Sequence, residues 1–211
     1  MPDTLTDQIL PSSESAADKS EANDGRLRHF VISCSDRALP DLAAHGFSRE
    51  EILSHVNLGN LALAGDLNCA SAMQFAVDVC EVESLSVIGH LGCRAIGAAM
   101  NRRSAMLLRQ WLSPIAGLAA KYSDMLGVSG DSQTVLDRLS ALNAIEQAAR
   151  LCRGLAVSSA WQRRQKLTVN GLILDRNGCV LPQPTFSAAA VDDIDPNFRQ
   201  ALENISHRII A

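Results

Sequence analysis

The chain has 211 residues, of which 47% are hydrophobic, 20% are charged and 4% are aromatic. These proportions are typical of a single globular domain with an aliphatic core. The net charge of −4 and the absence of a long Lys/Arg block give no basis for binding nucleic acid or an anionic membrane. No apolar run approaches the roughly 18 residues of a membrane span, and the N-terminus lacks the pattern of a signal peptide, so we expect a cytoplasmic protein.

The cysteines are expected to be reduced thiols. A chain of this length without an export signal seldom carries a disulfide framework, so some thiols are available to bind a metal ion. Others are expected to be small buried apolar residues, and we assign Cys69, Cys80 and Cys152 to this group. The six cysteines are Cys34, Cys69, Cys80, Cys93, Cys152 and Cys179.

The two ends of the chain differ in composition from the middle. Residues 1–25 are rich in Ser, Asp, Glu and Ala, which predicts a flexible N-terminal arm. The alternative is a short helix over residues 5–10 that docks on a partner. Residues 26–211 are expected to form one domain, with a C-terminal extension from about residue 183.

Two predicted strands deliver polar side chains at their ends. The apolar run over 28–34 is typical of a buried strand and is followed by Ser35-Asp36-Arg37. The run over 84–89 predicts a second strand that leads into His90-Leu91-Gly92-Cys93. In an open α/β sheet, the carboxyl ends of the strands are the usual place for a functional site.

The other expected elements alternate between helices and strands. Apolar residues recur at helical spacing in several stretches, and an Asn-Gly dipeptide predicts a hairpin between the last two strands. In chain order we expect a loop and a segment over 50–60 with a turn at Gly59-Asn60, helices over 68–81, 94–126 (broken near Pro114) and 132–155, strands over 166–174 and 179–181, and a helix over 195–210. This order predicts an α/β fold with a mostly parallel central sheet and helices on both faces.

Cys34 and the His90-x-x-Cys93 pair form a candidate metal site. Thiolate sulfur and imidazole nitrogen are ligands that zinc prefers, and a site with three protein ligands keeps a fourth position open for catalysis. The alternative is that Cys34 and Cys93 are buried apolar residues and His90 is a hydrogen-bonded core histidine.

Two motifs carry a resemblance to a known family: Cys34-Ser35-Asp36-Arg37, and Val87-Ile88-Gly89-His90-Leu91-Gly92-Cys93. The chain resembles the β-class carbonic anhydrases, which have Cys-x-Asp-x-Arg after the first strand and His-x-x-Cys after the second. The resemblance covers roughly residues 28–182. It includes Asn57-x-Gly59-Asn60, Trp111-Leu112, Asn143-x-x-x-Gln147, Gly171, Asp175 and Gly178.

The resemblance implies one zinc ion per subunit, bound by Cys34, His90 and Cys93. It implies reversible hydration of carbon dioxide to bicarbonate by a zinc-bound hydroxide, and a homodimer or higher homo-oligomer. Proteins similar to this family act on carbonyl sulfide or carbon disulfide, so a hydrolase of these substrates is an alternative. A catalytically inactive zinc-binding homologue with a scaffold role is another.

In the family, the aspartate orients the hydroxide and is held by the arginine two residues later. Here position 38 is Ala, and Arg37 comes one residue early. We favour a one-residue deletion after Asp36, which would let Arg37 recover the pair and makes these two the catalytic residues. Alternatively, Arg37 points away from its neighbour and Asp36 closes the zinc site as a fourth ligand.

Three further positions depart from the family pattern. Arg94 stands where the family usually has Gly, Val56 where it often has Arg, and Leu58 where Ala is common. The guanidinium of Arg94 would supply the partner of Asp36, block the mouth of the site, or point to solvent. The residues expected to line the substrate pocket are Val56, Leu58, Gly59, Leu91 and Arg94.

Overall fold

The structure is a computed structural model that describes residues 25–39, 42–43, 47–101, 103–127, 131–182 and 185–208. The expected arm over 1–25 and its alternative helix over 5–10 lie outside these residues, apart from Gly25. Among the described helices, none combines the length and the apolar character needed to cross a lipid bilayer.

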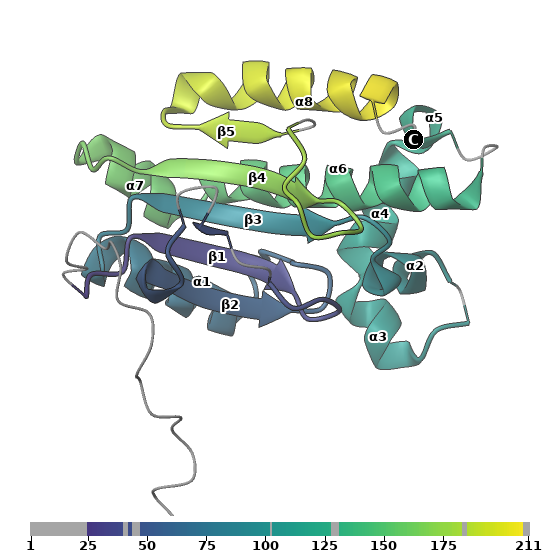
Figure 1. The fold of residues 1–211 in the computed structure, drawn as a ribbon, viewed down its shortest axis with the longest axis horizontal. Coiled ribbons are helices and arrows are strands. Elements are labelled where there is room, and N and C mark those ends of the chain that lie inside the picture. The colour runs from purple at the N-terminus through teal and green to yellow at the C-terminus, as the bar shows by residue number, and fades with distance from the viewer. Residues whose placement is uncertain are drawn as a thin grey trace, which may run out of the picture.

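A five-stranded sheet forms the centre of the fold, with strand order β2-β1-β3-β4-β5 (Figure 1). The first four strands in this order are parallel, and only β5 is antiparallel to its neighbour β4. The α/β class and the mostly parallel sheet are therefore confirmed. The strands are β1 His29–Cys34, β2 Ile52–Asn57, β3 Ser84–His90, β4 Thr168–Leu174 and β5 Phe186–Ala188.

The helices lie mainly between β3 and β4 and after β5. The helix expected over 68–81 is present as α1, which continues as a π-helical turn, and Asp66 caps its start by accepting from the Asn68 N–H. The region 94–126 is divided into four short helices, and Pro114 lies in the first turn of one of them, where a proline is tolerated. The helices are α1 Leu67–Gln74, α2 Arg94–Met100, α3 Met106–Trp111, α4 Ser113–Lys121, α5 Ser123–Leu126, α6 Ser132–Cys152, α7 Leu155–Gln162 and α8 Ile194–Arg208, with shorter turns η2 Arg49–Glu51, η3 Phe75–Val79 and η4 Val191–Asp193.

Two details at the last edge of the sheet differ from the sequence prediction. The expected strand over 179–181 is reduced to a single bridge between Leu174 and Val180. A short strand that the sequence did not predict, β5, pairs with β4 instead. It is held from the other side by α8, where the Asn197 side chain donates to the Ser187 carbonyl over 2.8 Å. Three residues are too few for a periodic signal, so β5 depends on tertiary contacts.

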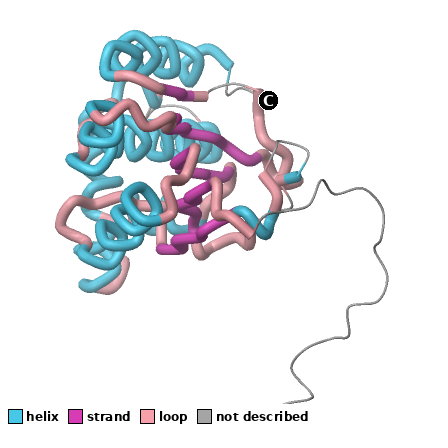
Figure 2. Tube along the Cα trace, turned by 90° about the vertical axis from the view of Figure 1, so that its left-hand side faces the viewer, coloured by secondary structure: helices cyan, strands magenta, loops and turns pink. Residues whose placement is uncertain are grey.

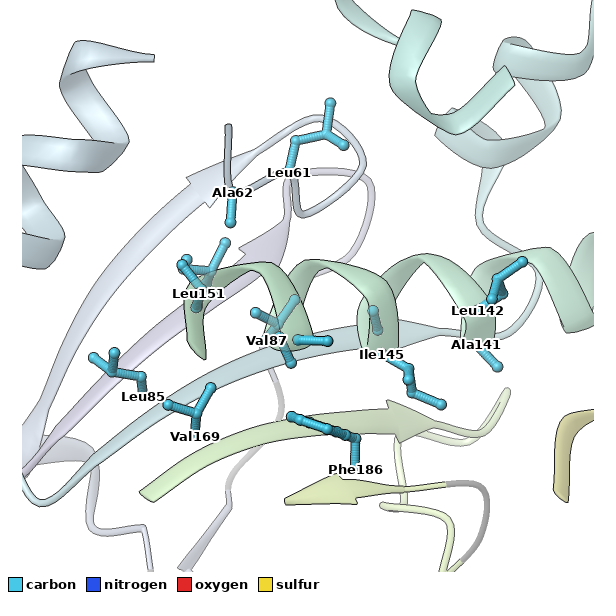
Figure 3. Packing of buried hydrophobic residues seen from close by; sticks show 14 of the residues in the cluster. Leu61, Ala62, Leu85, Val87, Ala141, Leu142, Ile145, Leu151, Val169 and Phe186 are labelled. Atoms are coloured by element: carbon cyan, nitrogen blue, oxygen red, sulfur yellow. The ribbon is translucent and has the colours of Figure 1, made fainter. Parts of the chain in front are cut away.

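Helix α6 packs directly over β3 and β4, and two glycines allow the close approach. A Cβ atom on Gly89 would lie 2.9 Å from the Ala144 Cβ, and one on Gly171 would lie 3.2 Å from the Ile145 Cα. Figure 3 shows Ile145 of α6 above Val87 and Val169 of the sheet, with Phe186 of β5 at the edge of the same cluster. This helix forms the rigid back of the region in which the strands end.

The two faces of the sheet are covered differently. Figure 2 shows the helices on one side of the strands and mainly loops on the other. On the loop side, Val31, Leu42 and Ile88 form a small buried cluster with Phe47 and other residues of the adjacent segments. The described part of this second face thus differs from the expected helical layer, because apolar side chains of the strands and of the adjacent loops cover it.

Candidate metal centre

Three possible metal ligands converge at the carboxyl ends of neighbouring parallel strands. Cys34 is the last residue of β1, His90 is the last residue of β3, and Cys93 precedes the first turn of α2. All three are buried, and their ligand atoms lie within 4.8 Å of one another. In Figure 1 the arrowheads of β1 and β3 point toward α2, where the cluster forms. The structure therefore brings together the three residues that the sequence singled out.

The geometry of the cluster fits a tetrahedral metal ion. The Sγ atoms of Cys34 and Cys93 are 3.7 Å apart, and both thiols are free. Two thiolates bound to zinc at about 2.3 Å with tetrahedral angles would be separated by about 3.8 Å. His90 directs Nδ1 to the Leu91 carbonyl at 3.2 Å, while its buried Nε2 has no hydrogen-bond partner among the described residues. A buried nitrogen of this kind needs a partner, and a metal ion would supply it.

The environment of the two thiols favours a thiolate at Cys34. The hydrogen bond with Cys93 lowers the pKa of Cys34, against the effect of burial, and the same hydrogen bond raises the pKa of Cys93. The backbone N–H groups of Asp36 and Gly59 also donate to the Cys34 sulfur, over 3.4 and 3.3 Å. These amides remain available to a metal-bound sulfur and fix its position.

The cysteines outside the cluster behave differently. Burial raises the pKa of Cys69 to about 11 and that of Cys152 to about 12, so both are inert thiols of the core. Cys80 is only partly buried, and Cys179 is exposed.

Asp36 lies beside the cluster and is clamped by Arg94. Its Oδ2 is 3.9 Å from the His90 Nε2. The Arg94 Nε donates to Oδ1 over 2.6 Å, and the Arg94 backbone N–H donates to Oδ2 over 2.8 Å. The expected pair of Asp36 with Arg37 is absent, because Arg37 donates to two backbone carbonyls elsewhere. Of the three orientations considered for Arg94, the structure shows the one that supplies the partner of Asp36.

The carbonyls that bind Arg37 belong to the turn after β4. Arg37 donates to the Asp175 oxygen over 3.0 Å and to the Arg176 oxygen over 2.8 Å. The Arg176 side chain in turn forms an ion pair with the buried Asp137 of α6, at 2.5 Å. The roles of Asp137 and Arg176 could not be predicted from the sequence, because nothing in a helix or a hairpin turn by itself indicates a contact across 39 positions.

The loop after β2 forms another wall of the centre and is held by α6. The Asn143 side chain donates to the Gly59 carbonyl over 2.8 Å, and the Gln147 side chain accepts from the Ala62 N–H over 3.0 Å. These two buried amides are also hydrogen-bonded to each other, at 3.2 Å. Both had been noted as features of the resemblance, and their contacts explain why amides are needed inside an apolar helix face.

The residues expected to line the pocket lie around this loop. Gly59 has a φ of 81° and contacts the Cys34 sulfur through its N–H. Val56 and Leu58 are exposed, at 54% and 40%, and the Leu58 carbonyl accepts from the Trp111 indole over 2.8 Å. Leu91 is partly buried against the main core. Their assignment to a substrate pocket stays a prediction.

An open groove of about 1010 Å³ lies at the opposite end of the sheet. It is lined by His29, Ser84 and Thr168, the first residues of β1, β3 and β4, together with residues such as Trp161 and Arg164. Because the metal ligands are at the other ends of the same strands, this groove is separate from the candidate centre.

The comparison with known proteins agrees with this site. The family model described as carbonic anhydrase matches residues 29–179, which contain all three ligands. A carbonic anhydrase of Emericella nidulans is 25% identical over 147 residues, covering 70% of this chain and 64% of the relative. One of Candida albicans is 29% identical over 154 residues, covering 72% of this chain and 54% of the relative. The chain thus spans less than two thirds of the length of these relatives.

Solved structures show the same fold. The β-carbonic anhydrase of Coccomyxa, in complex with acetazolamide, has a TM-score of 0.74 and 25% identity, covering 84% of this chain and 81% of the other. A structure from a study of two tetrameric β-carbonic anhydrases of Sordaria macrospora has a TM-score of 0.67 and 24% identity, covering 74% and 81%. The family match, these folds and the cluster of two cysteines and one histidine together show that the chain belongs to the β-carbonic anhydrase family.

Proposed function

We propose that this chain catalyses the zinc-dependent, reversible hydration of carbon dioxide to bicarbonate. The observation that carries the proposal is the convergence of two thiols, one unpartnered imidazole nitrogen and one clamped carboxylate at the ends of β1 and β3. The carbonic anhydrases of Emericella nidulans and Candida albicans support the same activity.

The residues present fit a zinc ion, and Cys34, His90 and Cys93 would hold it. When bound, zinc supplies a Lewis acid that lowers the pKa of water toward neutrality, which provides a nucleophile for carbon dioxide. The two thiolates balance the charge of a divalent ion, so the ion would lower the pKa of water less than it would with neutral ligands. Neighbouring side chains that orient the reacting groups therefore matter more.

Asp36 is the side chain placed to orient the nucleophile. Each of its oxygens accepts one N–H from Arg94, and a carboxylate oxygen can accept more than one hydrogen bond. Since Oδ2 lies 3.9 Å from the His90 Nε2, it faces the cluster and can accept a hydrogen bond from a group bound there. Arg94 fixes the carboxylate in this orientation, which is the role that the family assigns to an arginine in another position.

The loop after β2 supplies an apolar approach for a neutral substrate. Val56 and Leu58 expose aliphatic side chains beside the loop that contacts the Cys34 sulfur. Carbon dioxide is small and carries no net charge, so aliphatic contacts favour its approach without holding bicarbonate.

The direct test is stopped-flow hydration of carbon dioxide by the zinc-loaded protein. We expect activity at about pH 7 or about pH 8.5, and both values are needed because the nucleophile forms only on deprotonation of water. Cys93→Ser should abolish zinc binding and activity, whereas Cys80→Ser, which alters a partly buried thiol outside the cluster, should change neither. Bound zinc without activity at either pH would refute the proposed reaction and favour an inactive homologue with a scaffold role.

Carbonyl sulfide or carbon disulfide is the second candidate substrate. The exposed Val56 and Leu58 favour it, because sulfur is larger and more polarizable than oxygen, so these molecules gain more from aliphatic contacts than carbon dioxide does. Release of hydrogen sulfide by the zinc-loaded protein, together with slow hydration of carbon dioxide, would support this candidate. Hydration without release of hydrogen sulfide would exclude it.

A homodimer or higher homo-oligomer is proposed as the assembly. In the described residues β2 pairs only with β1, so its outer edge is open to another strand. Large aliphatic side chains are exposed in β2 and α3, with Val56 at 54%, Met106 at 70% and Leu107 at 74%. The tetramers of Sordaria macrospora are consistent with this assembly. Light scattering coupled to size exclusion would give the mass, and a monomer at all concentrations would contradict the proposal.

A further inference from the structure

The turn after β4 connects the two loops that carry the metal ligands. Its residues 175–179 lie at the carboxyl end of the sheet, where β4 ends beside β3 in Figure 1. One loop follows β1 and contains Cys34 and Asp36, and the other follows β3 and contains His90 and Cys93. The turn contacts both loops, through separate groups.

The turn is braced by its own hydrogen bonds. The Asp175 carboxylate accepts from the N–H groups of Asn177 and Cys179, each over 2.8 Å. The Asp175 N–H donates to the Cys179 carbonyl over 2.8 Å, and the Gly178 N–H donates to the Asp175 carbonyl over 3.2 Å. The hydrogen bond from the Cys179 backbone N–H is the main cause that lowers the pKa of Asp175. The Asp175 carboxylate therefore stays charged at neutral pH. A turn closed in this way presents its carbonyls and the Arg176 side chain at fixed positions.

The first contact of the turn is with the loop after β1, through Arg37. The guanidinium of Arg37 spans the carbonyls of Asp175 and Arg176 at 3.0 and 2.8 Å. Arg37 also closes the β1 loop locally, since its N–H donates to the Cys34 carbonyl over 3.2 Å. The loop that presents Cys34 is therefore tied to the turn at the residue after Asp36.

The second contact of the turn is with the loop after β3, through Arg176 and Asp137. The Arg176 guanidinium pairs with Asp137 Oδ2 at 2.5 Å, and Asp137 Oδ1 accepts the Gly92 N–H over 2.8 Å. The Arg176 Nη1 would lie 2.7 Å from a Cβ on Gly92, so the guanidinium covers this residue closely. Gly92 stands between His90 and Cys93 and has a φ of 69°, a conformation that favours glycine.

The burial of Asp137 strengthens its ion pair with Arg176. The Asp137 side chain is 10% exposed, whereas the Arg176 side chain is 52% exposed. A buried carboxylate needs charged or polar partners, and Asp137 has three: Arg176, the Gly92 N–H and the Gln133 side chain at 3.2 Å. Removing Arg176 leaves the carboxylate with less compensation and releases the cover over Gly92.

We propose that the turn over 175–179 is a latch that sets the separation of the two ligand-bearing loops, and that Arg176 and Asp137 are positioning residues for the metal centre. The inference rests on the proposed metal site, but not on the reaction catalysed there. Neither residue touches the ligand atoms directly, and each acts on them through Gly92. Groups that orient metal ligands in this way typically change metal affinity by about 10–100-fold when they are removed.

The test measures metal retention and metal geometry in the full chain. We expect Arg176→Gln to release zinc to a chromogenic chelator about 10–100-fold faster than the unaltered protein. The visible spectrum of the cobalt-substituted variant should also change, because its bands depend on the angles between the ligands. Asp137→Asn keeps an acceptor for the Gly92 N–H but loses the charge, so its release rate should lie between those of the unaltered protein and Asp137→Ala.

Arg153→Gln is the matched control. Arg153 is as exposed as Arg176, with 50% of its side chain accessible, and forms an ion pair with the exposed Asp195 at 2.9 Å. It follows the far end of α6, about 24 Å along the helix axis from Asp137 at 1.5 Å per residue. We expect its zinc release rate and its cobalt spectrum to match those of the unaltered protein.

The outcomes separate the latch from the proposed function. If Arg176→Gln releases zinc within about twofold of the Arg153→Gln control and keeps the cobalt spectrum, the latch is refuted. An unaltered protein that binds neither zinc nor cobalt would refute the metal site and the latch together. Bound zinc with rapid release in Arg176→Gln, but no hydration of carbon dioxide, would support the latch and refute only the proposed reaction. Should Asp137→Ala fail to fold, the half-exposed Arg176 still decides the question.

Discussion

Arg94 holds both carboxylate oxygens of Asp36, one through its guanidinium at 2.6 Å and the other through its backbone N–H at 2.8 Å. The backbone donor belongs to the first residue of α2, directly after the ligand Cys93. The orientation of Asp36 is thus set from the helix that follows one ligand, rather than from the loop that follows another. This arrangement places the clamp on an exposed side chain, since 83% of the Arg94 side chain is accessible.

The first prediction concerns this clamp. Arg94→Ala should lower kcat/KM for hydration of carbon dioxide by about 10–100-fold, because Asp36 would keep only the backbone donor. Stability should also fall, by about 1–3 kcal/mol, since the Asp36 side chain is only 10% exposed and would lose a charged donor. Ala38→Arg combined with Arg94→Gly should recover part of the activity, because it returns the arginine to the family position. Stopped-flow assays and urea denaturation measure the two effects.

Arg109→Ala is the control for the clamp, because Arg109 is an exposed arginine of the nearby helix α3. Full activity in Arg94→Ala would show that the clamp has no role in the reaction.

The convergence of Cys34, His90 and Cys93 could be predicted from the sequence, but the partner of Asp36 could not. Cys34 and His90 end two apolar runs, and parallel neighbouring strands bring such ends together whatever the loops do. Asp36 and Arg37 lie in a turn that the Arg37 N–H closes on the Cys34 carbonyl, and from there the Arg37 side chain reaches the turn after β4. Choosing between Arg37 and Arg94 required the three-dimensional path of both loops.

The central strands and the long helix were predictable for a related reason. β1 and β3 are continuous apolar runs, and α6 has 21 residues over Ser132–Cys152, a length that favours a helix over a strand. β5 contains only three residues, and its position depends on β4 on one side and α8 on the other. The pair of Asp137 and Arg176 was equally hidden, because it joins two elements that are distant in the sequence.

The second prediction concerns removal of the metal ion. Zinc bound only by the native state stabilises it by RT ln(1 + [L]/Kd), which is about 2.7 kcal/mol at a hundredfold excess over Kd. Treatment with a chelator, or Cys34→Ser, should therefore lower the unfolding temperature and remove about one zinc per chain, measured by calorimetry and metal analysis. Cys80→Ser should keep the zinc content and the response to the chelator, since its thiol lies outside the cluster. An unfolding temperature that does not respond to zinc or chelator would contradict a site of this kind.

The third prediction concerns the approach of α6 to the sheet. Gly89→Ala would place a Cβ 2.9 Å from the Ala144 Cβ and 3.2 Å from the Ser140 carbonyl oxygen, so the helix must shift. Overpacking of this kind should cost about 1–3 kcal/mol in the free energy of unfolding, measured with urea. Because Gly89 precedes His90, the variant should also bind zinc more weakly.

Gly117→Ala is the matched control for this packing. Gly117 lies in α4 with nothing within 4 Å of an added Cβ. The same substitution there should stabilise the protein by up to about 1 kcal/mol, because alanine favours a helix over glycine. Equal effects at both positions would show that the contact with Ala144 does not limit the approach of the helix.

The fourth prediction concerns the pH dependence of stability at the other end of the sheet. Burial lowers the pKa of His29 below its usual value of 6.5, with Glu51 and Glu83 acting in the opposite direction. Its Nδ1 is 2.9 Å from the Ser84 hydroxyl. The unfolded chain therefore takes up a proton at this histidine at a higher pH than the folded protein does. The stability that His29 contributes is complete above about pH 6.5 and is lost as the pH falls through the folded value.

His29→Asn should accordingly reduce the loss of stability between about pH 7.5 and about pH 5.5, because only the natural side chain titrates in this interval. Urea denaturation of both proteins over the same pH series measures the effect, and the difference between their slopes cancels the contribution of the metal ligands, which both proteins share. The variant can be less stable than the natural protein at pH 7.5, since the contact with Ser84 is altered, but its curve should be flatter. Parallel curves would show that His29 takes up its proton equally in the folded and the unfolded chain, contrary to the effect expected from its burial.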